Sequence, residues 1–335
     1  MSLPLLTATG LLAACVLDRC LGEPRRWHPL LGFGRLAAGV ESILNRAGRA
    51  DTESYPLAQR LKGLLALLLL TGPLTALAFW IQWRLLSSGL GAMLVYGVVA
   101  SFVLYWALGW RSLVQHLNEI EAALQGGTID EARAQVGRVV SRDCESLQWP
   151  DLRRAAIESG LENTCDAIVG PLFWFLVAGI PGAVLYRLSN TLDALWGYRT
   201  ARHRHFGWAA ARWDDLLNLL PARLTALAFA LSAPLVTGSW RSVPSALNAW
   251  RTQAGACASP NAGPVMCAGA GALDVRLGGP TSYHGAAAEK PWMGSEREPD
   301  QRDLRRALVL INHSVLLLLV PTLLVLLILS GGGHG

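Results

Sequence analysis

Residues 158–186 read E-S-G-L-E-N-T-C-D-A-I-V-G-P-L-F-W-F-L-V-A-G-I-P-G-A-V-L-Y. Glu158, Glu162 and Asp166 stand four residues apart, which on a helix places them on one face with neighbouring Cβ atoms about 5–6 Å from each other. The apolar run 167–186 follows directly and is long enough to enter a membrane. Because a carboxylate near hydrocarbon is costly, this face needs a compensating arginine or divalent cation, unless it is an ordinary solvated helix face.

The composition agrees with a membrane protein. Hydrophobic residues make up 52% of the 335 residues, charged residues only 16%, and the mean hydropathy is +0.33. A soluble domain usually carries about 25% charged residues. We therefore expect an all-α, polytopic protein with about 4–6 transmembrane or re-entrant helices, folded as a single membrane-embedded domain with helical cytoplasmic loops. No cluster of Lys and Arg interleaved with aromatic residues suggests nucleic-acid binding.

Four apolar runs predict plain spans, and two more contain helix-breaking residues. Gly170-Pro171 and Gly179-Ile-Pro181-Gly182 interrupt the run 167–186, and Pro221 and Pro234 interrupt the run 216–237. Broken or re-entrant helices occur where backbone lines a protected cavity. The plain spans are expected at 3–17, 61–83, 90–110 and 307–330.

The basic residues predict the orientation. Many Lys and Arg precede residue 63, whereas Arg84 is the single basic residue between the spans 61–83 and 90–110. The positive-inside rule then places segments of about 18–60, 111–166 and 240–306 in the cytoplasm. The sidedness of 189–215 stays open, although its arginines favour the inside. Residues 48–56 look like a polar linker, and the tail G-G-G-H-G fits an external C-terminus.

Several motifs carry polar side chains at the ends of these runs. They are D-R-C-L-G-E-P at 18–24, Y-R-L-S-N-T-L-D at 186–193, R-H-F-G-W-A-A-A-R-W-D-D-L-L-N-L-L-P-A-R-L-T at 204–225, S-P-N-A-G at 259–263 and G-A-L-D-V-R-L-G-G-P-T-S-Y at 271–283. Together with E-S-G-L-E-N-T-C-D, this ordered set resembles the CobD/CbiB family of cobalamin biosynthesis. The resemblance covers most of the chain.

The resemblance implies an integral membrane adenosylcobinamide(-phosphate) synthase of the bacterial cytoplasmic (inner) membrane, with its active site facing the cytoplasm. Such a ligase joins (R)-1-amino-2-propanol, or its O-phosphate, to a propionate carboxylate of adenosylcobyric acid at the expense of ATP. The corrinoid is then a substrate, ATP and Mg²⁺ are required, and other membrane enzymes of the pathway are possible partners. The resemblance does not decide between the free and the phosphorylated amine.

The residue chemistry is compatible with that reaction. A carboxylate becomes reactive towards an amine when ATP phosphorylates it, the charge that develops calls for Mg²⁺ and Arg, and a base must remove a proton from the amine. We expect catalytic roles for Glu158, Glu162, Asp166, Asp193 and Asp214, with Glu158, Glu162 and Asp166 as magnesium ligands. The expected substrate-binding residues are Asp18, His28, Asn163, Arg187, Asn190, Tyr198, Arg204, Arg212, Asp215, Asn218, Arg223, Ser259, Asn261 and Gly263.

Plainer interpretations stay open. Asp214 and Asp215 can be interfacial ion pairs with Arg212 and Arg223, and Tyr198 can be an aromatic anchor at the membrane surface. Two other classes of protein also remain. One is an intramembrane, Mg²⁺-dependent prenyltransferase-like enzyme, and the other is a non-catalytic transporter or sensor relative.

Overall fold

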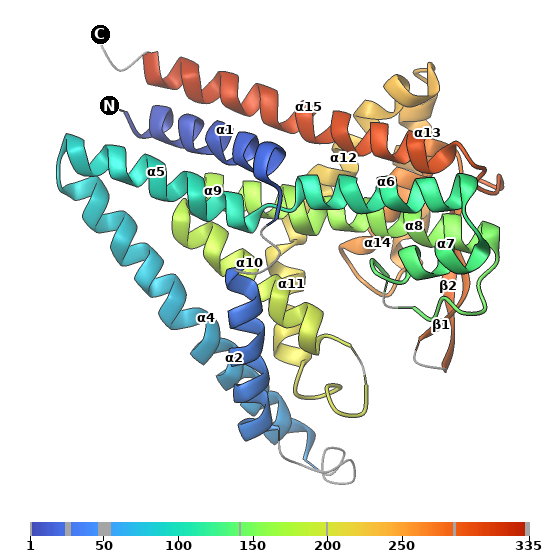
Figure 1. Ribbon diagram of the computed structural model, residues 1–335, viewed down its shortest axis with the longest axis horizontal. Helices are drawn as coiled ribbons and strands as arrows, with labels where there is room; N and C mark the ends of the chain where they lie inside the picture. Colours follow the sequence, from blue (N-terminus) through green and yellow to red (C-terminus); the bar gives the residue numbers. More distant parts are fainter. Residues whose placement is uncertain are drawn as a thin grey trace. The chain divides into compact units, whose positions relative to one another are not determined.

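The computed structural model describes residues 2–23, 28–45, 55–140, 142–198, 200–283 and 286–331 (Figure 1). Most of the predicted linker 48–56 and the tail 332–335 lie outside these residues. The described chain forms two compact units, each built from separate stretches of sequence. The first unit comprises residues 1–109, 170–218 and 323–335, and the second comprises 110–169 and 219–322.

All the regular elements described in the first unit are helices. Its core contains Phe33, Trp196 and Phe206, with the last two rings in edge-to-face contact at 5.1 Å between centroids. Such pairs add to the stabilisation that comes from burial alone. Its helices are α1 (Leu3–Leu21), α2 (Pro29–Leu44), α4 (Pro56–Ser87), α5 (Leu90–Ala107), α9 (Gly170–Ala178), α10 (Ile180–Trp196) and α11 (Trp208–Leu217).

The second unit combines helices with one β-hairpin. Its elements are α6 (Trp110–Gly126), α7 (Ile129–Val136), α8 (Trp149–Thr164), the π-helix η1 (Cys165–Val169), α12 (Leu219–Thr237), α13 (Ser242–Gln253), the short 3₁₀-helix η2 (Ala254–Ala256), α14 (Ala262–Leu273), β1 (Arg276–Tyr283) and β2 (Ala286–Gly294). The last helix, α15 (Asp303–Gly331), begins in this unit and ends in the first.

The prediction of an all-α polytopic membrane protein is confirmed. Within the described residues, six helical runs are long and apolar enough to cross a membrane. They are Leu3–Leu21, Pro56–Ser87, Leu90–Gly126, Trp149–Ala178, Leu219–Thr237 and Asp303–Gly331. Two of them extend into 111–166, which the sequence had placed in the cytoplasm. The acids of α8 therefore lie inside a candidate span and not before one.

Helix breaks follow local sequence signals. Gly179, with a φ of 68°, separates α9 from α10, and Gln82 Oε1 accepts a hydrogen bond from the Ile180 N–H at 2.9 Å. This break was predicted from the Gly179–Gly182 motif. Gly170-Pro171, in contrast, does not break the helix, because the extra residue of a π-turn at Cys165–Val169 absorbs the distortion. The start of α7 also follows a local signal, with Thr128 and Glu131 forming a capping box.

The hairpin β1–β2 is the element that the sequence analysis missed, because 240–306 was expected to be helical. The strands are antiparallel, and Leu277 pairs with Met293 and Gly279 with Lys290. The register shifts between these pairs, because Gly278 alone lies opposite two residues of β2, Pro291 and Trp292, which form a bulge. Gly278 has a φ of 86°, and a Cβ there would lie 2.1 Å from the Pro291 carbonyl oxygen, so only glycine fits.

Candidate functional site

Glu158 is the buried acid around which the second unit is assembled. Only 1% of Glu158 is exposed to solvent. Oε1 accepts a hydrogen bond from the Gly278 N–H at 2.8 Å, and Oε2 contacts Lys290 Nζ at 3.0 Å and the Arg142 guanidinium. One carboxylate therefore contacts both strands of the hairpin and the segment after α7. The sequence analysis required a compensating arginine or divalent cation for these acids. For Glu158 the compensating groups are an arginine and a lysine.

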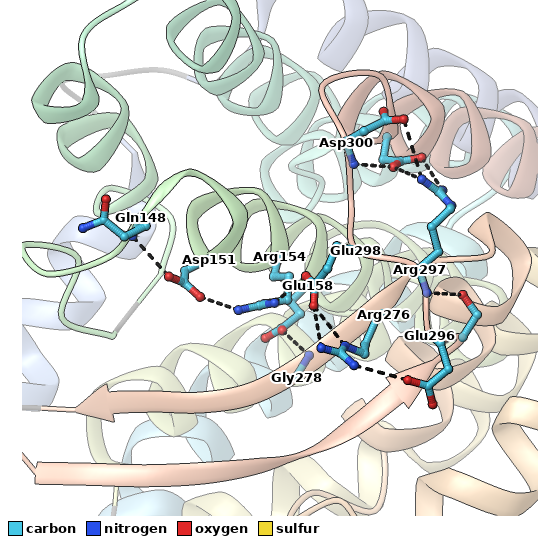
Figure 2. A network of polar contacts seen from close by, with 12 residues as sticks. Gln148, Asp151, Arg154, Glu158, Arg276, Gly278, Glu296, Arg297, Glu298 and Asp300 are labelled. Atoms are coloured by element: carbon cyan, nitrogen blue, oxygen red, sulfur yellow. Dashed lines mark hydrogen bonds and ion pairs between the residues drawn. The ribbon is translucent and has the colours of Figure 1, made fainter.

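A second polar network continues along α8 towards the hairpin (Figure 2). Arg154 bonds to Asp151 one turn before it and to Glu298, while Arg276 at the start of β1 reaches Glu298 at 2.8 Å. Both guanidinium groups lie over the Trp292 ring, Arg276 at 4.3 Å and Arg154 at 5.3 Å from its centroid. Such cation–π contacts and ion pairs hold the hairpin on α8.

The other polar residues of α8 lie near its C-terminal end. Glu162, Asn163 and Asp166 are all partly exposed. Asn163 Nδ2 donates to the Ser159 carbonyl at 2.9 Å. Asp166 lies within the π-turn, so the helix face that Glu158 and Glu162 share in the regular α-helix does not continue to Asp166.

The described residues do not assemble the predicted magnesium site. No group of three or more His, Cys, Asp or Glu side chains in them is placed to hold a metal ion. Both Glu158 oxygens already contact donors, and Asp166 leaves the regular stripe. The set of Glu158, Glu162 and Asp166 therefore does not fit a protein-bound metal.

Arg223 and the start of α14 form a further polar cluster in the second unit. Arg223 donates to Asn261 Oδ1 at 2.5 Å, and Asn261 is the N-cap residue of α14. The Ser259 hydroxyl accepts from the Ala262 N–H at 3.1 Å, as expected for a helix start. Gly263 allows close packing, because a Cβ there would meet the Ala254 carbonyl oxygen at 2.8 Å. Arg223, Ser259, Asn261 and Gly263 are thus brought together.

In the first unit, Asp214 lies in a buried hydrogen-bonded group. Asn218 Nδ2 donates to Asp214 at 2.8 Å, Asn190 Nδ2 lies 3.4 Å from its other oxygen, and the Tyr186 hydroxyl donates to Asn218 Oδ1 at 2.8 Å. The pKa of Asp214 is raised to about 6, mainly by burial. The hydrogen bonds from Asn218 and Asn190 act to lower this pKa, and the nearby charge of Asp215 acts to raise it. Asp214 is therefore not simply an ion-pair partner of arginine.

The neighbouring charged residues are more exposed. Arg212 pairs with Asp215 at 3.3 Å across one helical turn, which agrees with the plainer interpretation of Asp215. Arg204 is exposed, and Tyr198 is 44% exposed. Asp193 is partly buried on α10, one turn before Gly197.

Asp18 and His28 lie on either side of the α1–α2 connection. Asp18 is 2% exposed near the end of α1, where the Tyr105 hydroxyl donates to the Gly22 carbonyl at 2.6 Å. His28 is the N-cap residue of α2 and accepts from the Leu30 N–H at 3.3 Å. The motif 18–29 is described except for residues 24–27.

Comparison with known proteins identifies the family. The model of the family described as "CobD/Cbib protein" matches residues 11–311. The chain belongs to the CobD/CbiB family. Relatives within the family include proteins called "Cobalamin biosynthesis protein CobD" from three bacteria. The chain is 50% identical over 304 residues to that of Chromobacterium violaceum, 48% over 302 residues to that of Stutzerimonas stutzeri and 42% over 304 residues to that of Mycobacterium tuberculosis.

These similarities extend over nearly the whole of each protein. The alignments cover 91%, 90% and 90% of this chain and 92%, 92% and 90% of the three relatives. No solved structure matches this CobD/CbiB chain.

Sequence reasoning about this CobD/CbiB protein missed one polar cluster of the first unit. Glu41 Oε1 accepts from Arg202 Nε at 2.6 Å and lies 2.9 Å from His203 Nε2. Burial acts to raise the pKa of Glu41, but the bonds from Arg202 and His203 outweigh it and leave the pKa below its usual value. The only signal was an isolated acid in the otherwise apolar and glycine-rich stretch 29–44.

The sequence analysis also missed the partners of Glu158, which are Arg142, Lys290 and Gly278. The rarity of lysine, present only at 62 and 290, was the one available hint for Lys290. Arg142 and Gly278 carried no distinguishing pattern in the sequence.

Proposed function

We propose that this protein is the amide-forming synthase of cobalamin biosynthesis that its family suggests. It would join (R)-1-amino-2-propanol, or its O-phosphate, to a propionate carboxylate of adenosylcobyric acid with consumption of ATP. The observation that carries the proposal is the match to the CobD/CbiB family over residues 11–311, together with relatives that bear the name cobalamin biosynthesis protein.

The chemistry needs two steps. In the first, the carboxylate oxygen attacks the γ-phosphorus of ATP, giving an acyl phosphate and ADP. In the second, the amine nitrogen attacks the acyl carbon, the C–O bond to phosphate breaks, and amide and inorganic phosphate leave. The ammonium form of the amine has no lone pair, so a base must first accept its proton.

Asp214 has the properties of such a base. A catalytic base works best when its pKa lies near the working pH, and the pKa of Asp214 is raised to about 6 by burial. Asn218 and Asn190 hold the carboxylate in one orientation without adding charge. We assign proton acceptance from the amine to Asp214.

The arginines of the motifs suit the anionic reactants. Arg is well suited to bidentate contacts with phosphate and carboxylate oxygens. Arg204 and Arg212 lie exposed in the first unit, and Arg223 is held by Asn261 in the second. ATP would arrive as its magnesium complex, with phosphate and water oxygens as the principal metal ligands, as is usual for Mg²⁺. Glu162 and Asp166 remain the carboxylates proposed to contact that complex.

The rival classes have less support. A prenyltransferase-like enzyme needs two separate acidic sets that hold magnesium diphosphate, and among the described residues no metal-holding group of three is present. In addition, Asp214 is bound by two amides and Asp215 by Arg212. A transporter or sensor relative would not require the raised pKa of Asp214.

The test is turnover by the purified full-length protein in detergent. With adenosylcobyric acid, Mg-ATP and aminopropanol or its phosphate, mass spectrometry should detect the corresponding amide and an equal amount of ADP. Diphosphate release from a prenyl donor, or tight corrinoid binding without ATP consumption in every mixture, would reject the synthase proposal in favour of one of the rivals.

A further inference from the structure

Two cysteines of the second unit lie in contact beside the start of α14, and neither has a role in the proposed amide synthesis. Cys257 is the C-cap residue of η2 and is partly exposed, whereas Cys267 is fully buried within α14. A hydrogen bond links the two thiols. A buried cysteine is ordinarily an inert small residue, so the partly exposed partner is what makes this pair different.

The backbone brings Cys257 onto the face of α14 that carries Cys267. A Cβ added to Gly263 would lie 2.9 Å from the Cβ of Cys257 and 3.4 Å from its Sγ. Cys267 follows Gly263 by four residues, and therefore lies one turn further along the same helix face. Two thiols in hydrogen-bond contact meet a main requirement for a disulfide, which is that the side chains point towards each other.

A third sulfur atom fixes the position of the Cys257 side chain. The Cys257 thiol donates to Met293 Sδ on β2 at 3.7 Å, and Met293 itself is buried. On the other side, Gly255, Ala256 and Ala258 next to Cys257 in the chain are exposed. A small reagent can therefore reach the Cys257 sulfur from the loop side, while Cys267 lies behind it.

The surroundings assign different roles to the two thiols. The hydrogen bond from Cys267 and the charge of Lys290 lower the pKa of the Cys257 thiol below its usual value, although burial and Glu158 act to raise it. The hydrogen bond to Cys257, together with burial, raises the pKa of Cys267. Because the thiolate is the nucleophile, Cys257 is the attacking thiol and Cys267 the resolving thiol.

We propose that Cys257 and Cys267 are a reversible oxidation site, at which a low-molecular-weight disulfide converts the two thiols into one disulfide bond that restrains the loop before α14. The loop closed by this bond contains Ser259 and Asn261, which form the start of α14. This inference goes beyond amide synthesis and does not depend on it. Disulfides of reducing compartments are usually transient or redox-sensing, and a partly exposed pair suits that behaviour.

The oxidation takes place in two exchange steps. The Cys257 thiolate attacks one sulfur of glutathione disulfide, the S–S bond of that molecule breaks, and the first glutathione leaves as a thiolate. The Cys267 sulfur then attacks the Cys257 sulfur of the mixed disulfide, and the second glutathione leaves. The protons of the two cysteines pass to the two departing thiolates. The protein loses two electrons, and one glutathione disulfide becomes two glutathione molecules.

The test is made on the reduced full-length protein in detergent. After incubation with glutathione disulfide, the remaining thiols are alkylated and the protein is digested with trypsin. The chain has no Lys or Arg between Arg251 and Arg276, so both cysteines fall in one tryptic peptide. Mass spectrometry should show this peptide lighter by two hydrogen atoms and alkylated about tenfold less than before oxidation, with dithiothreitol restoring alkylation. Unchanged alkylation, or glutathione bound separately to each cysteine, would overturn the proposal.

Substitutions separate the two roles. Cys267→Ser should stop the reaction at a mixed disulfide between Cys257 and glutathione, whereas Cys257→Ser should leave Cys267 unmodified because it is buried. Cys20→Ser removes an exposed cysteine of the first unit and is the matched control, in which the disulfide should form as in the wild type. Loss of the disulfide in Cys20→Ser, or oxidation of Cys267 in Cys257→Ser, would contradict the assigned pairing.

Hydrogen exchange of the wild-type protein measures the effect on the loop and needs no substitution. Amides of residues 258–263 should exchange about tenfold more slowly after oxidation, because the cross-link opposes local opening of the segment. Equal or faster exchange in the oxidised protein would show that the disulfide does not restrain the start of α14.

Discussion

Tyr186 donates its hydroxyl hydrogen to Asn218 Oδ1 at 2.8 Å, and this bond sets the direction of the Asn218 amide. With Oδ1 accepting from the tyrosine, Nδ2 is turned towards Asp214, to which it donates at 2.8 Å. Gly170 makes room for the tyrosine ring, since a Cβ at 170 would lie 2.1 Å from it. The orientation of the proposed base thus depends on Tyr186, which acts on it through Asn218.

Tyr186→Phe should therefore lower kcat about tenfold or more with little change in KM, because it releases Asn218 without removing any group that binds substrate. Steady-state kinetics of amide formation measure the two constants separately. Tyr55→Phe, at an exposed tyrosine of the same unit, serves as a comparison for general effects of removing a hydroxyl group. A rise in KM alone would assign Tyr186 to substrate binding.

The pH dependence of turnover should report Asp214. Because a base must be ionised, kcat should fall on the acid side with a midpoint near the pKa of about 6. In Asp214→Asn the acid limb should disappear together with most of the activity. If the residual activity of Asp214→Asn still fell on the acid side with the same midpoint, Asp214 would be excluded as the base.

Stability should depend on the same carboxyl group with a defined sign. The folded pKa is raised to about 6 from 3.8, so between these values the folded state binds more protons than the unfolded state. The free energy of unfolding should then decrease as the pH rises through this window, on the order of a few kcal/mol from this group. Thermal unfolding in detergent should show a falling midpoint between pH 4 and 6, absent in Asp214→Asn.

Glu158→Gln should destabilise the second unit by about 3–5 kcal/mol, because Arg142 and Lys290 would keep their charges without the buried carboxylate. Thermal unfolding of the detergent-solubilised protein measures the effect. Adding Lys290→Met to Glu158→Gln should recover part of the loss. Wild-type stability of the single variant would show that Glu158 does not hold the hairpin.

Glu162→Gln and Asp193→Asn should abolish turnover yet leave membrane expression intact, since both residues are partly exposed. Turnover and membrane yield of each variant are measured in parallel. Wild-type turnover in either variant would remove that residue from the mechanism.

Gly278→Ala should disrupt the hairpin and the hydrogen bond to Glu158 together. The φ of 86° and the 2.1 Å approach to the Pro291 carbonyl oxygen leave no room for a methyl group. Hydrogen exchange of the strands should become faster. Gly255→Ala is the control, because a Cβ there meets nothing within 4 Å. Equal protection in both variants would contradict the need for glycine at 278.

The sequence by itself determined the fold class, most of the membrane helices and the break at Gly179. Apolar runs, glycine-proline pairs and capping residues act over a few neighbours, so their effects can be read locally. It also determined that the acids of 158–166 needed compensating partners. The ordered motifs indicated the family, which the comparison then confirmed.

Only the tertiary structure decided which partner each buried group has. Glu158 contacts Gly278 and Lys290, more than a hundred residues further along the chain, and β1 and β2 lack the alternating pattern that reveals a strand. The same holds for Asp214, whose raised pKa comes from burial among amides supplied by two helices. Burial and charge compensation are properties of residues brought together in space, and sequence spacing does not record them.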